Sequence, residues 1–264
     1  MERIEALRGY YETHNEDERL QKKRGLVEFF TTVHYVERYL RPGMRILEIG
    51  AGTGRYSHYF ARNGYAVDAI ELMECNIDVF RKNTLPHEPV SVMQGDAIRL
   101  DAVASEQYDV TLLLGPMYHL YTEEDQRAAL REAIRVTKPG GVVFVAYCLN
   151  EATAYQFLFM KGNIKDEFYR QKIDVDTFKL SSEPQEVFCM HRKEEIDRLM
   201  QGFAVERLHY VGTDMLTRYI TPYVEQMDDE VFDLYMKYHL CICERADCVG
   251  LSNHALDVFR KEPL

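Results

Sequence analysis

Three closely spaced glycines form the clearest chemical pattern in this 264-residue chain. Gly50, Gly52 and Gly54 follow a short apolar run, and Glu48 stands two residues before the first of them. Glycine lets the backbone turn sharply and lets a ligand approach where a Cβ atom would collide, so we expect a ligand over this turn. The dinucleotide fingerprint needs its third glycine where this chain has Arg55, which disfavours a nicotinamide cofactor. A nicotinamide-dependent oxidoreductase therefore remains only as the alternative enzyme class.

Two further acidic residues stand at the ends of the next two expected strands. Glu71 comes about 20 residues after Gly50, where nucleotide-binding folds place an acid that accepts both ribose hydroxyls. Asp96 ends the third strand. An acid at a strand end is usually only a solvated charge, and each of these residues alone would be interpreted that way. Together with Glu48 they form a set in register with the glycine turn, which agrees with one ligand bound along the three strand ends.

The spacing of Glu48 and the three glycines resembles motif I of the class I S-adenosylmethionine-dependent methyltransferases. The resemblance implies that Glu48 lies near the amino-acid end of S-adenosylmethionine and that Asp96 meets the adenine amino group. The Lys-Pro-Gly-Gly run at 138–141, before the fifth strand, adds to the likeness. The resemblance implies S-adenosylmethionine as the cofactor and S-adenosylhomocysteine as the product. The cofactor-binding residues expected on this basis are Glu48, Gly50, Gly52, Gly54, Glu71, Leu72, Asp96, Ala97, Leu114 and Gly115.

A finer resemblance extends over nearly the whole chain. Leu113–Leu120, which contains a Gly-Pro-Met-Tyr-His-Leu run, and Tyr238–Leu240 with Cys243–Arg245 are similar to a bacterial subgroup of small-molecule methyltransferases. This likeness implies methyl transfer to a small molecule and leaves the acceptor and the methylated atom open. A non-catalytic regulator that binds S-adenosylmethionine would carry the same motifs, so it stays as the alternative from another class.

Candidate catalytic residues follow the fourth strand, because ligands collect at the carboxyl ends of parallel strands. Methyl transfer from a sulfonium is an in-line displacement, so the site mainly holds the acceptor and excludes water, and a base is optional. His119 would move a proton and Tyr118 would cover the cofactor, although such a histidine is more often structural. Tyr147, Asn150 and Tyr11 are the candidate acceptor-binding residues.

Weaker candidates flank this set. Tyr10, Arg19 and Arg24 precede the core and could fold over the cofactor, with an arginine meeting its carboxylate, although a solvated amphipathic helix explains any one of them better. His191 and His239 lie in later segments that are expected to cap the site.

Composition and one missing motif restrict the partners. The formal net charge of -11 repels phosphate polyanions, which disfavours nucleic acids and anionic membrane surfaces. Methyltransferases of exocyclic nucleobase amines usually carry Asn/Asp-Pro-Pro-Tyr/Phe after the fourth strand, whereas residues 115–118 read Gly-Pro-Met-Tyr. The polar side chain that would hold a nucleobase amine is absent. A small-molecule acceptor is therefore expected, and the oligomeric state stays open.

Cysteine usage and apolar run length indicate the compartment. The six cysteines show no framework spacing, and the N-terminus has no apolar leader, so a reducing cytoplasm is expected. The longest apolar stretches are far shorter than the roughly 20 residues that cross a bilayer. Cys241, Cys243 and Cys248 lie close together without an evident fourth ligand, so no metal is expected.

The elements that must position these residues alternate between strand and helix. The pattern predicts an α/β fold with a doubly wound, mainly parallel, seven-stranded Rossmann-like sheet. A helix should start after Gly54 and end at Gly64, and another should start at Thr122 and end at the 138–141 run. The expected core strands are Arg45–Ile49, Ala66–Ile70, Pro89–Met93, Val110–Leu114 and Val142–Ala146.

We expect a single methyltransferase domain over residues 1–264. Residues 1–40 would form N-terminal lid helices, 41–149 the cofactor-binding core, 150–190 an inserted helical cap, and 191–264 the C-terminal strands and helix. In that last part the expected elements are a helix at Glu194–Met200 and strands at Val205–Tyr210 and Ala255–Arg260. A longer helix should bury one apolar face made of Val231, Leu234, Tyr235, Tyr238 and Ile242.

Overall fold

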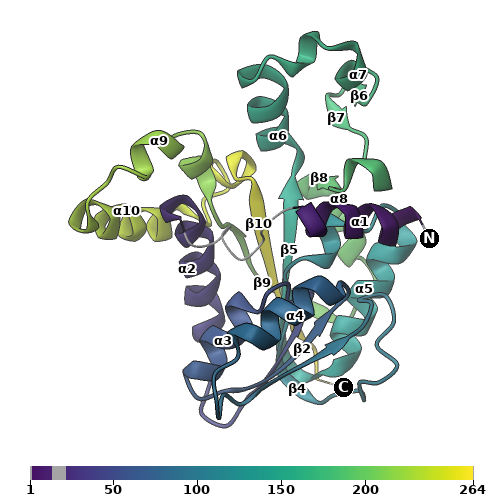
Figure 1. The fold of residues 1–264 in the computed structure, drawn as a ribbon, viewed down its shortest axis with the longest axis vertical. Helices are drawn as coiled ribbons and strands as arrows, with labels where there is room; N and C mark the ends of the chain where they lie inside the picture. Colours follow the sequence, from purple (N-terminus) through teal and green to yellow (C-terminus); the bar gives the residue numbers. More distant parts are fainter. Residues whose placement is uncertain (1, 14–21, 264) are drawn as a thin grey trace.

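A mixed sheet forms the centre of the computed structural model, which describes residues 2–13 and 22–263 (Figure 1). The strand order is β3-β2-β1-β4-β5-β10-β9. The first five strands run parallel, and β10 is antiparallel to both β5 and β9. These strands span Arg45–Ile49 (β1), Ala66–Glu71 (β2), Val90–Gln94 (β3), Tyr108–Leu113 (β4), Thr137–Leu149 (β5), Val205–Gly212 (β9) and His254–Lys261 (β10).

This arrangement confirms the predicted doubly wound, mainly parallel sheet. A short strand, β8 (Met190–His191), adds an eighth member by pairing with the end of β5. Helices cover both faces of the sheet in Figure 1. They are α2 (Lys23–Glu37), α3 (Arg55–Arg62), α4 (Glu74–Asn83), α5 (Glu123–Val136) and α8 (Lys193–Met200), while α1 (Glu2–Thr13) lies beyond the carboxyl ends of the parallel strands.

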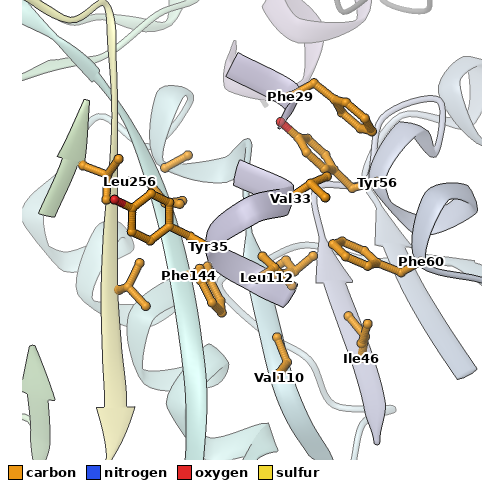
Figure 2. Packing of buried hydrophobic residues seen from close by; sticks show 14 of the residues in the cluster. Phe29, Val33, Tyr35, Ile46, Tyr56, Phe60, Val110, Leu112, Phe144 and Leu256 are labelled. Carbon is orange, nitrogen blue, oxygen red and sulfur yellow. The ribbon is translucent and has the colours of Figure 1, made fainter. Parts of the chain in front are cut away.

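Two apolar cores lie on the two faces, because successive strand residues point to opposite sides of a sheet. On one face, Ile46, Leu112 and Phe144 pack under α2 and α3, as Figure 2 shows. On the other, Leu47 and Leu113 pack under α5 and α8. Both strands are buried almost throughout, and their side chains alternate between the two cores.

The helix boundaries follow local signals with one correction. The Thr122 hydroxyl caps α5 by accepting the Asp125 N–H at 3.1 Å. However, α5 ends at Val136 and β5 begins at Thr137, so the 138–141 run lies inside the strand instead of ending the helix. Thr137 pairs with Tyr108, and the register then shifts so that Val110 pairs with Val142. The Pro-Gly-Gly residues lie in this irregular part of the strand.

The inserted cap contains more than helices. It stands above the sheet in Figure 1 and begins with α6 (Asn150–Thr153) and a π-helix, η3 (Ala154–Met160). A 3₁₀ turn, η4 (Asn163–Lys165), and α7 (Glu167–Arg170) follow, and then β6 (Ile173–Asp174) pairs with β7 (Lys179–Leu180) as a small antiparallel ribbon. A further 3₁₀ turn, η5 (Pro184–Glu186), leads back to β8.

The C-terminal helix α10 (Asp229–Ile242) buries a different face from the predicted one. Val231, Leu234 and Tyr238 are 46%, 57% and 60% exposed, whereas Phe232 and His239 are buried. Apolar residues surround much of this helix, so periodicity alone did not fix its inward face. Packing against α2 and the short elements η6 (Met215–Arg218) and α9 (Thr221–Val224) decides it. A 3₁₀ turn, η7 (Val249–Leu251), lies between α10 and β10.

No helix within residues 2–13 and 22–263 is long and apolar enough to cross a membrane.

Candidate functional site

A pocket with a volume of about 440 Å³ opens at the carboxyl ends of the parallel strands. Its wall runs from Asp96 beyond β3, through the glycine turn after β1, to His254 at the start of β10. Helix α1 contributes Arg3, Leu7 and Tyr11 to the wall. Nine of the ten predicted cofactor-binding residues line this pocket: Glu48, Gly50, Gly52, Glu71, Leu72, Asp96, Ala97, Leu114 and Gly115.

The glycine turn brings the backbone close to the segment after β4. Gly50 has a φ of +79°, and a Cβ atom there would lie 2.5 Å from Pro116 Cδ. Gly54 is the predicted residue that does not line the pocket. It has a φ of +89° and lies under the Phe80 ring, so its lack of a side chain serves the packing of α3 against α4. This corrects its expected role as a ligand contact.

Glu71 links the turn after β1 to the turn after β2. Its carboxylate accepts the Gly52 N–H at 2.8 Å and the Met73 N–H at 2.9 Å. Burial raises the pKa of this carboxyl, while these backbone N–H groups lower it. Glu71 thus presents carboxylate oxygens beside the glycine turn, as recognition of ribose hydroxyls requires.

Glu48 is buried at the end of β1 and lines the same pocket. Its carboxyl accepts the hydroxyl of Ser57 from α3. Burial raises the pKa of this carboxyl to about 8. A cationic group in the pocket would favour the ionised form, because an opposite charge offsets the cost of burial.

Asp96 pairs across the pocket with helix α1. The Arg3 guanidinium donates to one carboxylate oxygen of Asp96, and the Ile98 N–H donates to the other at 3.3 Å. This ion pair ties α1 to the end of the pocket where the adenine ring is expected.

A second tie joins α1 to the segment after β4. The Tyr11 hydroxyl lies 2.9 Å from His119 Nε2, and His119 Nδ1 lies 2.8 Å from the Val187 carbonyl oxygen. Because a carbonyl only accepts, Nδ1 carries the proton and Nε2 accepts from the tyrosine. Burial lowers the pKa of His119 to about 4, so the ring is neutral near pH 7. Both ring nitrogens make hydrogen bonds, so neither is available to take a proton from a methyl acceptor while α1 is in place.

The structure places the other candidates in two groups. Tyr118 and Tyr10 line the pocket, and Tyr118 lies 5.6 Å from the His254 ring between centroids. Arg24 does not line it, and Arg19 lies outside the described residues.

Two predicted acceptor-binding residues do not reach the pocket. Tyr147 is fully buried against His191, and Asn150 is 1% exposed and binds the backbone of Phe178 and Leu180. Strand alternation turns Tyr147 toward the α5 core, and Asn150 anchors the β-ribbon of the cap. Neither residue is retained as an acceptor contact, and the buried His191 and His239 do not line the pocket either.

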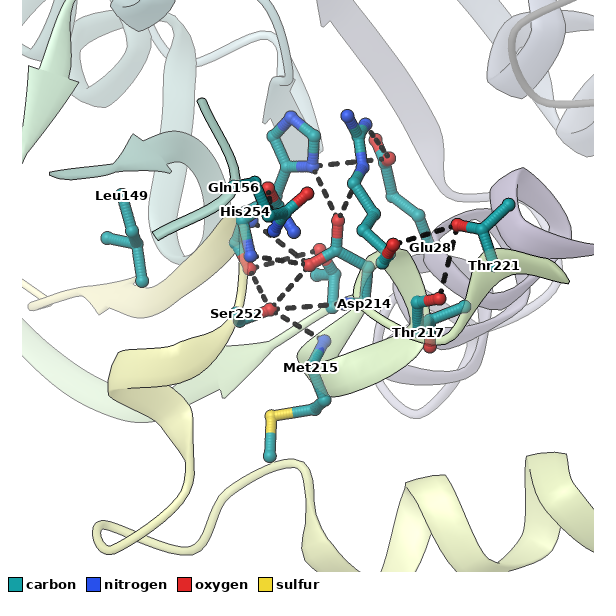
Figure 3. A network of polar contacts seen from close by, with 12 residues as sticks. Glu28, Leu149, Gln156, Asp214, Met215, Thr217, Thr221, Ser252 and His254 are labelled. Carbon is teal, nitrogen blue, oxygen red and sulfur yellow. Dashed lines mark hydrogen bonds and ion pairs between the residues drawn. The ribbon is translucent and has the colours of Figure 1, made fainter. Parts of the chain in front are cut away.

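A buried charge network that no sequence pattern indicated lies at the β10 end of the pocket (Figure 3). His254 Nδ1 lies 3.1 Å from Asp214 Oδ2 and 3.3 Å from Glu28 Oε2. Arg218 Nε lies 3.2 Å from Asp214 Oδ2. Burial alone would lower the pKa of His254, but Glu28 and Asp214 raise it to about 10. The only sequence signal was polar residues scattered over three distant segments.

This network could hold a metal only by losing its present pairs. The ligand atoms of Glu28, Asp214 and His254 lie within 4.8 Å of one another. However, Arg218 pairs with Asp214 at 3.2 Å and lies 3.9 Å from Glu28, and His254 is protonated. Two positive groups thus already balance two carboxylates, which leaves no net charge for a cation to neutralise. Cys243, one of the three cysteines that lie close together in the sequence, has its sulfur 3.3 Å from the Tyr35 hydroxyl.

Comparisons with known proteins agree with this geometry. Residues 46–141 match the protein family described as "Methyltransferase domain". An S-adenosyl-L-methionine-dependent Diels-Alderase, iccD, of Talaromyces variabilis is 30% identical over 106 residues, which are 39% of this chain and 35% of that protein. A ubiquinone biosynthesis O-methyltransferase of Stutzerimonas stutzeri is 28% identical over 127 residues, 47% of this chain and 53% of that protein. The matches thus span about a third to a half of these relatives.

A solved structure shares the fold over most of the chain. An S-adenosylmethionine-dependent methyltransferase from Methanosarcina mazei superposes with a TM-score of 0.56 at 15% identity, covering 87% of this chain and 98% of that one. Nine expected cofactor contacts, which include the glycine turn and the buried Glu71, line one pocket. Residues 46–141 therefore carry a methyltransferase domain, with S-adenosylmethionine as its cofactor, and the chain has the fold of the Methanosarcina mazei enzyme.

Proposed function

We propose that the chain transfers the methyl group of S-adenosylmethionine to a small-molecule acceptor. The observation that carries this proposal is the extent of the pocket. It continues past the glycine turn and the end of β4 to β10, so its wall is longer than the set of expected cofactor contacts. Its volume of about 440 Å³ lies within the usual range for small-molecule sites. The ubiquinone biosynthesis relative is named as an O-methyltransferase, which agrees with a small-molecule acceptor.

The cofactor supplies an electrophilic methyl group on a sulfonium when it is bound. The residues of this chain would then act mainly by binding and orientation. Glu71 would accept the ribose hydroxyls, Asp96 would face the adenine, and Glu48 would lie toward the amino-acid end. Gly115, after β4, allows the glycine turn to pack closely against it, since a Cβ atom there would come 3.3 Å from the Gly50 carbonyl oxygen. Tyr118 would cover the reacting atoms and exclude water.

His119 is not assigned the proton transfer in this proposal. Its two ring nitrogens are held by Tyr11 and Val187, so it would instead keep α1 closed over the pocket. We further propose that the chain acts in the cytoplasm on an acceptor other than a nucleic acid. Residues 1–40 and 150–190 would cover the core at 41–149, and residues 191–264 would complete the sheet.

The test combines cofactor binding with turnover. Calorimetric titration with S-adenosylmethionine and S-adenosylhomocysteine should show micromolar binding that Gly52→Arg abolishes, because the new side chain would fill the pocket. Gly43→Arg is the matched control, since Gly43 also has a positive φ, of +84°, but has open space around it. Incubation with methyl-labelled cofactor and a panel of phenols, amines, thiols and carboxylic acids should then give labelled product with equal S-adenosylhomocysteine.

The alternatives predict other outcomes. Tight cofactor binding without S-adenosylhomocysteine formation across the panel would contradict methyl transfer and would favour the regulator. Such a result would also fit a cofactor-dependent reaction of the kind named for the Diels-Alderase relative. Absence of cofactor binding by the folded wild-type protein would overturn the proposal as a whole.

A further inference from the structure

We propose that the β10 end of the pocket binds a carboxylate of the methyl acceptor through Asn253 and His254. This inference rests on the proposed methyl transfer and adds the chemical class of the acceptor to it. Both residues line the pocket, on the opposite side of the glycine turn from Glu71 and Asp96. Along the sheet order, the expected cofactor contacts lie at the ends of β3, β2, β1 and β4, whereas Asn253 and His254 lie at β10, beyond β5.

The first observation is an unpaired amide donor. Asn253 is 8% exposed, and its Nδ2 has no hydrogen-bond partner among the described residues. Its Oδ1 accepts from Gln156 Nε2 at 2.9 Å, which fixes the orientation of the amide. A buried N–H donor without a partner costs roughly 1–3 kcal/mol. Nδ2 is itself shielded from solvent, so a ligand oxygen would reach it through a small displacement of the atoms that cover it and would then remove that cost.

The second observation is the orientation of His254. Within the described residues its imidazole hydrogen bonds and ion pairs use Nδ1, toward Asp214 and Glu28, as Figure 3 shows. The ring lines the pocket, and Nε2 lies on the edge away from these carboxylates. Because the two carboxylates keep the ring protonated, Nε2 is an N–H donor.

The carboxylates that hold His254 are themselves occupied. Asp214 Oδ1 accepts from the Ser252 hydroxyl at 2.7 Å and from the backbone N–H of Asn253 at 2.8 Å. Asp214 Oδ2 faces His254 and Arg218. The acceptors of the network are therefore used internally, while the cationic ring of His254 and the Arg218 side chain line the pocket. Such a surface favours an anionic oxygen group over a cationic or purely apolar one.

The remaining wall indicates what the carboxylate is attached to. Tyr118, Phe157, Phe188 and Met190 also line the pocket, and the Tyr118 ring lies 5.6 Å from the His254 ring between centroids. They suit an apolar or aromatic body that would reach back toward Gly115 while its carboxylate stays at β10. A dianionic phosphate fits less well, because Asp214 and Glu28 already place two negative charges behind His254.

Matched acid and amide pairs test this inference without requiring turnover. The probes are benzoate, phenylacetate and 3-phenylpropionate, each with its isosteric primary amide, added to the S-adenosylhomocysteine complex at pH 7. Binding is measured by ligand-observed NMR. We expect at least one acid to bind tenfold or more tightly than its amide. Asn253→Asp should weaken that acid at least tenfold, since a carboxylate would replace the donor, and Asn253→Ala should weaken it less.

The controls separate this inference from the proposed function. Asn63→Asp makes the same change on an exposed asparagine outside the pocket and should leave acid binding unchanged. Each variant should bind S-adenosylhomocysteine as the wild type does. If the wild type fails to bind S-adenosylhomocysteine, the proposed function fails. If it binds, but acids bind no better than amides or both Asn253 variants keep full acid binding, the carboxylate site is refuted while methyl transfer stands.

Discussion

The two ends of the pocket are built in different ways. At the cofactor end, Glu71 accepts N–H groups from Gly52 and Met73, and both groups lie in turns that directly follow neighbouring strands. At the β10 end, His254 meets Glu28 from α2 and Asp214 from the segment after β9. The cofactor end thus depends on local turns, and the other end on contacts between distant segments. The cofactor end is therefore encoded locally, whereas the proposed acceptor surface depends on how the C-terminal elements dock.

Removing Asp214 should have the largest effect on folding. Asp214→Ala leaves His254 and Arg218 without their buried partner, and breaking a buried ion pair costs about 3–5 kcal/mol of the free energy of unfolding. Urea denaturation checks this. The exposed Asp101→Ala is the control and should change the free energy of unfolding by less than about 0.5 kcal/mol. A loss below about 1 kcal/mol for Asp214→Ala would show that the network does not hold the β10 end together.

Glu71→Ala should act mainly on cofactor binding. Losing charge-assisted hydrogen bonds costs about 2 kcal/mol, or roughly a 30-fold rise in the Kd of S-adenosylhomocysteine. Calorimetry at pH 7 measures it, and the neighbouring exposed Glu74→Ala should leave the Kd within about twofold. An unchanged Kd for Glu71→Ala would contradict the assignment of the adenosyl group to this end of the pocket.

The pH dependence of stability should report on the β10 end. The folded chain binds the His254 proton more tightly than the unfolded chain, with a pKa of about 10 against 6.5. This stabilisation is complete below pH 6.5 and is lost as the pH rises toward 10. The slope contributed by His254 is at most about 1.4 kcal/mol per pH unit.

Denaturation curves recorded from pH 6.5 to 9 measure this slope. His254→Gln should remove the part that His254 contributes, and the exposed His87→Gln should retain it. A slope that is the same in the wild type and in His254→Gln would mean that the ring does not carry the proton within the network of Glu28, Asp214 and Arg218.

The smallest expected effect belongs to the contact between α1 and the segment after β4. Tyr11→Phe removes the hydroxyl that meets His119 Nε2 at 2.9 Å. Losing one such hydrogen bond costs about 1 kcal/mol, so S-adenosylhomocysteine should dissociate about fivefold faster in stopped-flow measurements. Tyr223→Phe, at a residue 73% exposed, is the control. Equal dissociation rates would show that α1 does not restrain the cofactor.

Much of the fold was predictable because its signals are short in range. The five parallel strands, the Thr122 cap and the helix after Gly54 follow from apolar runs, capping residues and turn glycines. The inward face of α10 was predicted wrongly, because Phe232 and Val231 are both apolar and only docking chose between them. The cap likewise contains a two-stranded ribbon that no periodic pattern indicated.

By itself the sequence determined the cofactor end of the site. The glycine spacing and the acids at successive strand ends bring Glu48, Glu71 and Asp96 to one edge, because parallel strands end on the same side of a sheet. Only the tertiary structure decided the other end. The antiparallel return of β10 and the docking of α2 place His254 among Glu28 and Asp214, and they take Tyr147 into the core. Such contacts join residues distant in the chain, so no local pattern records them.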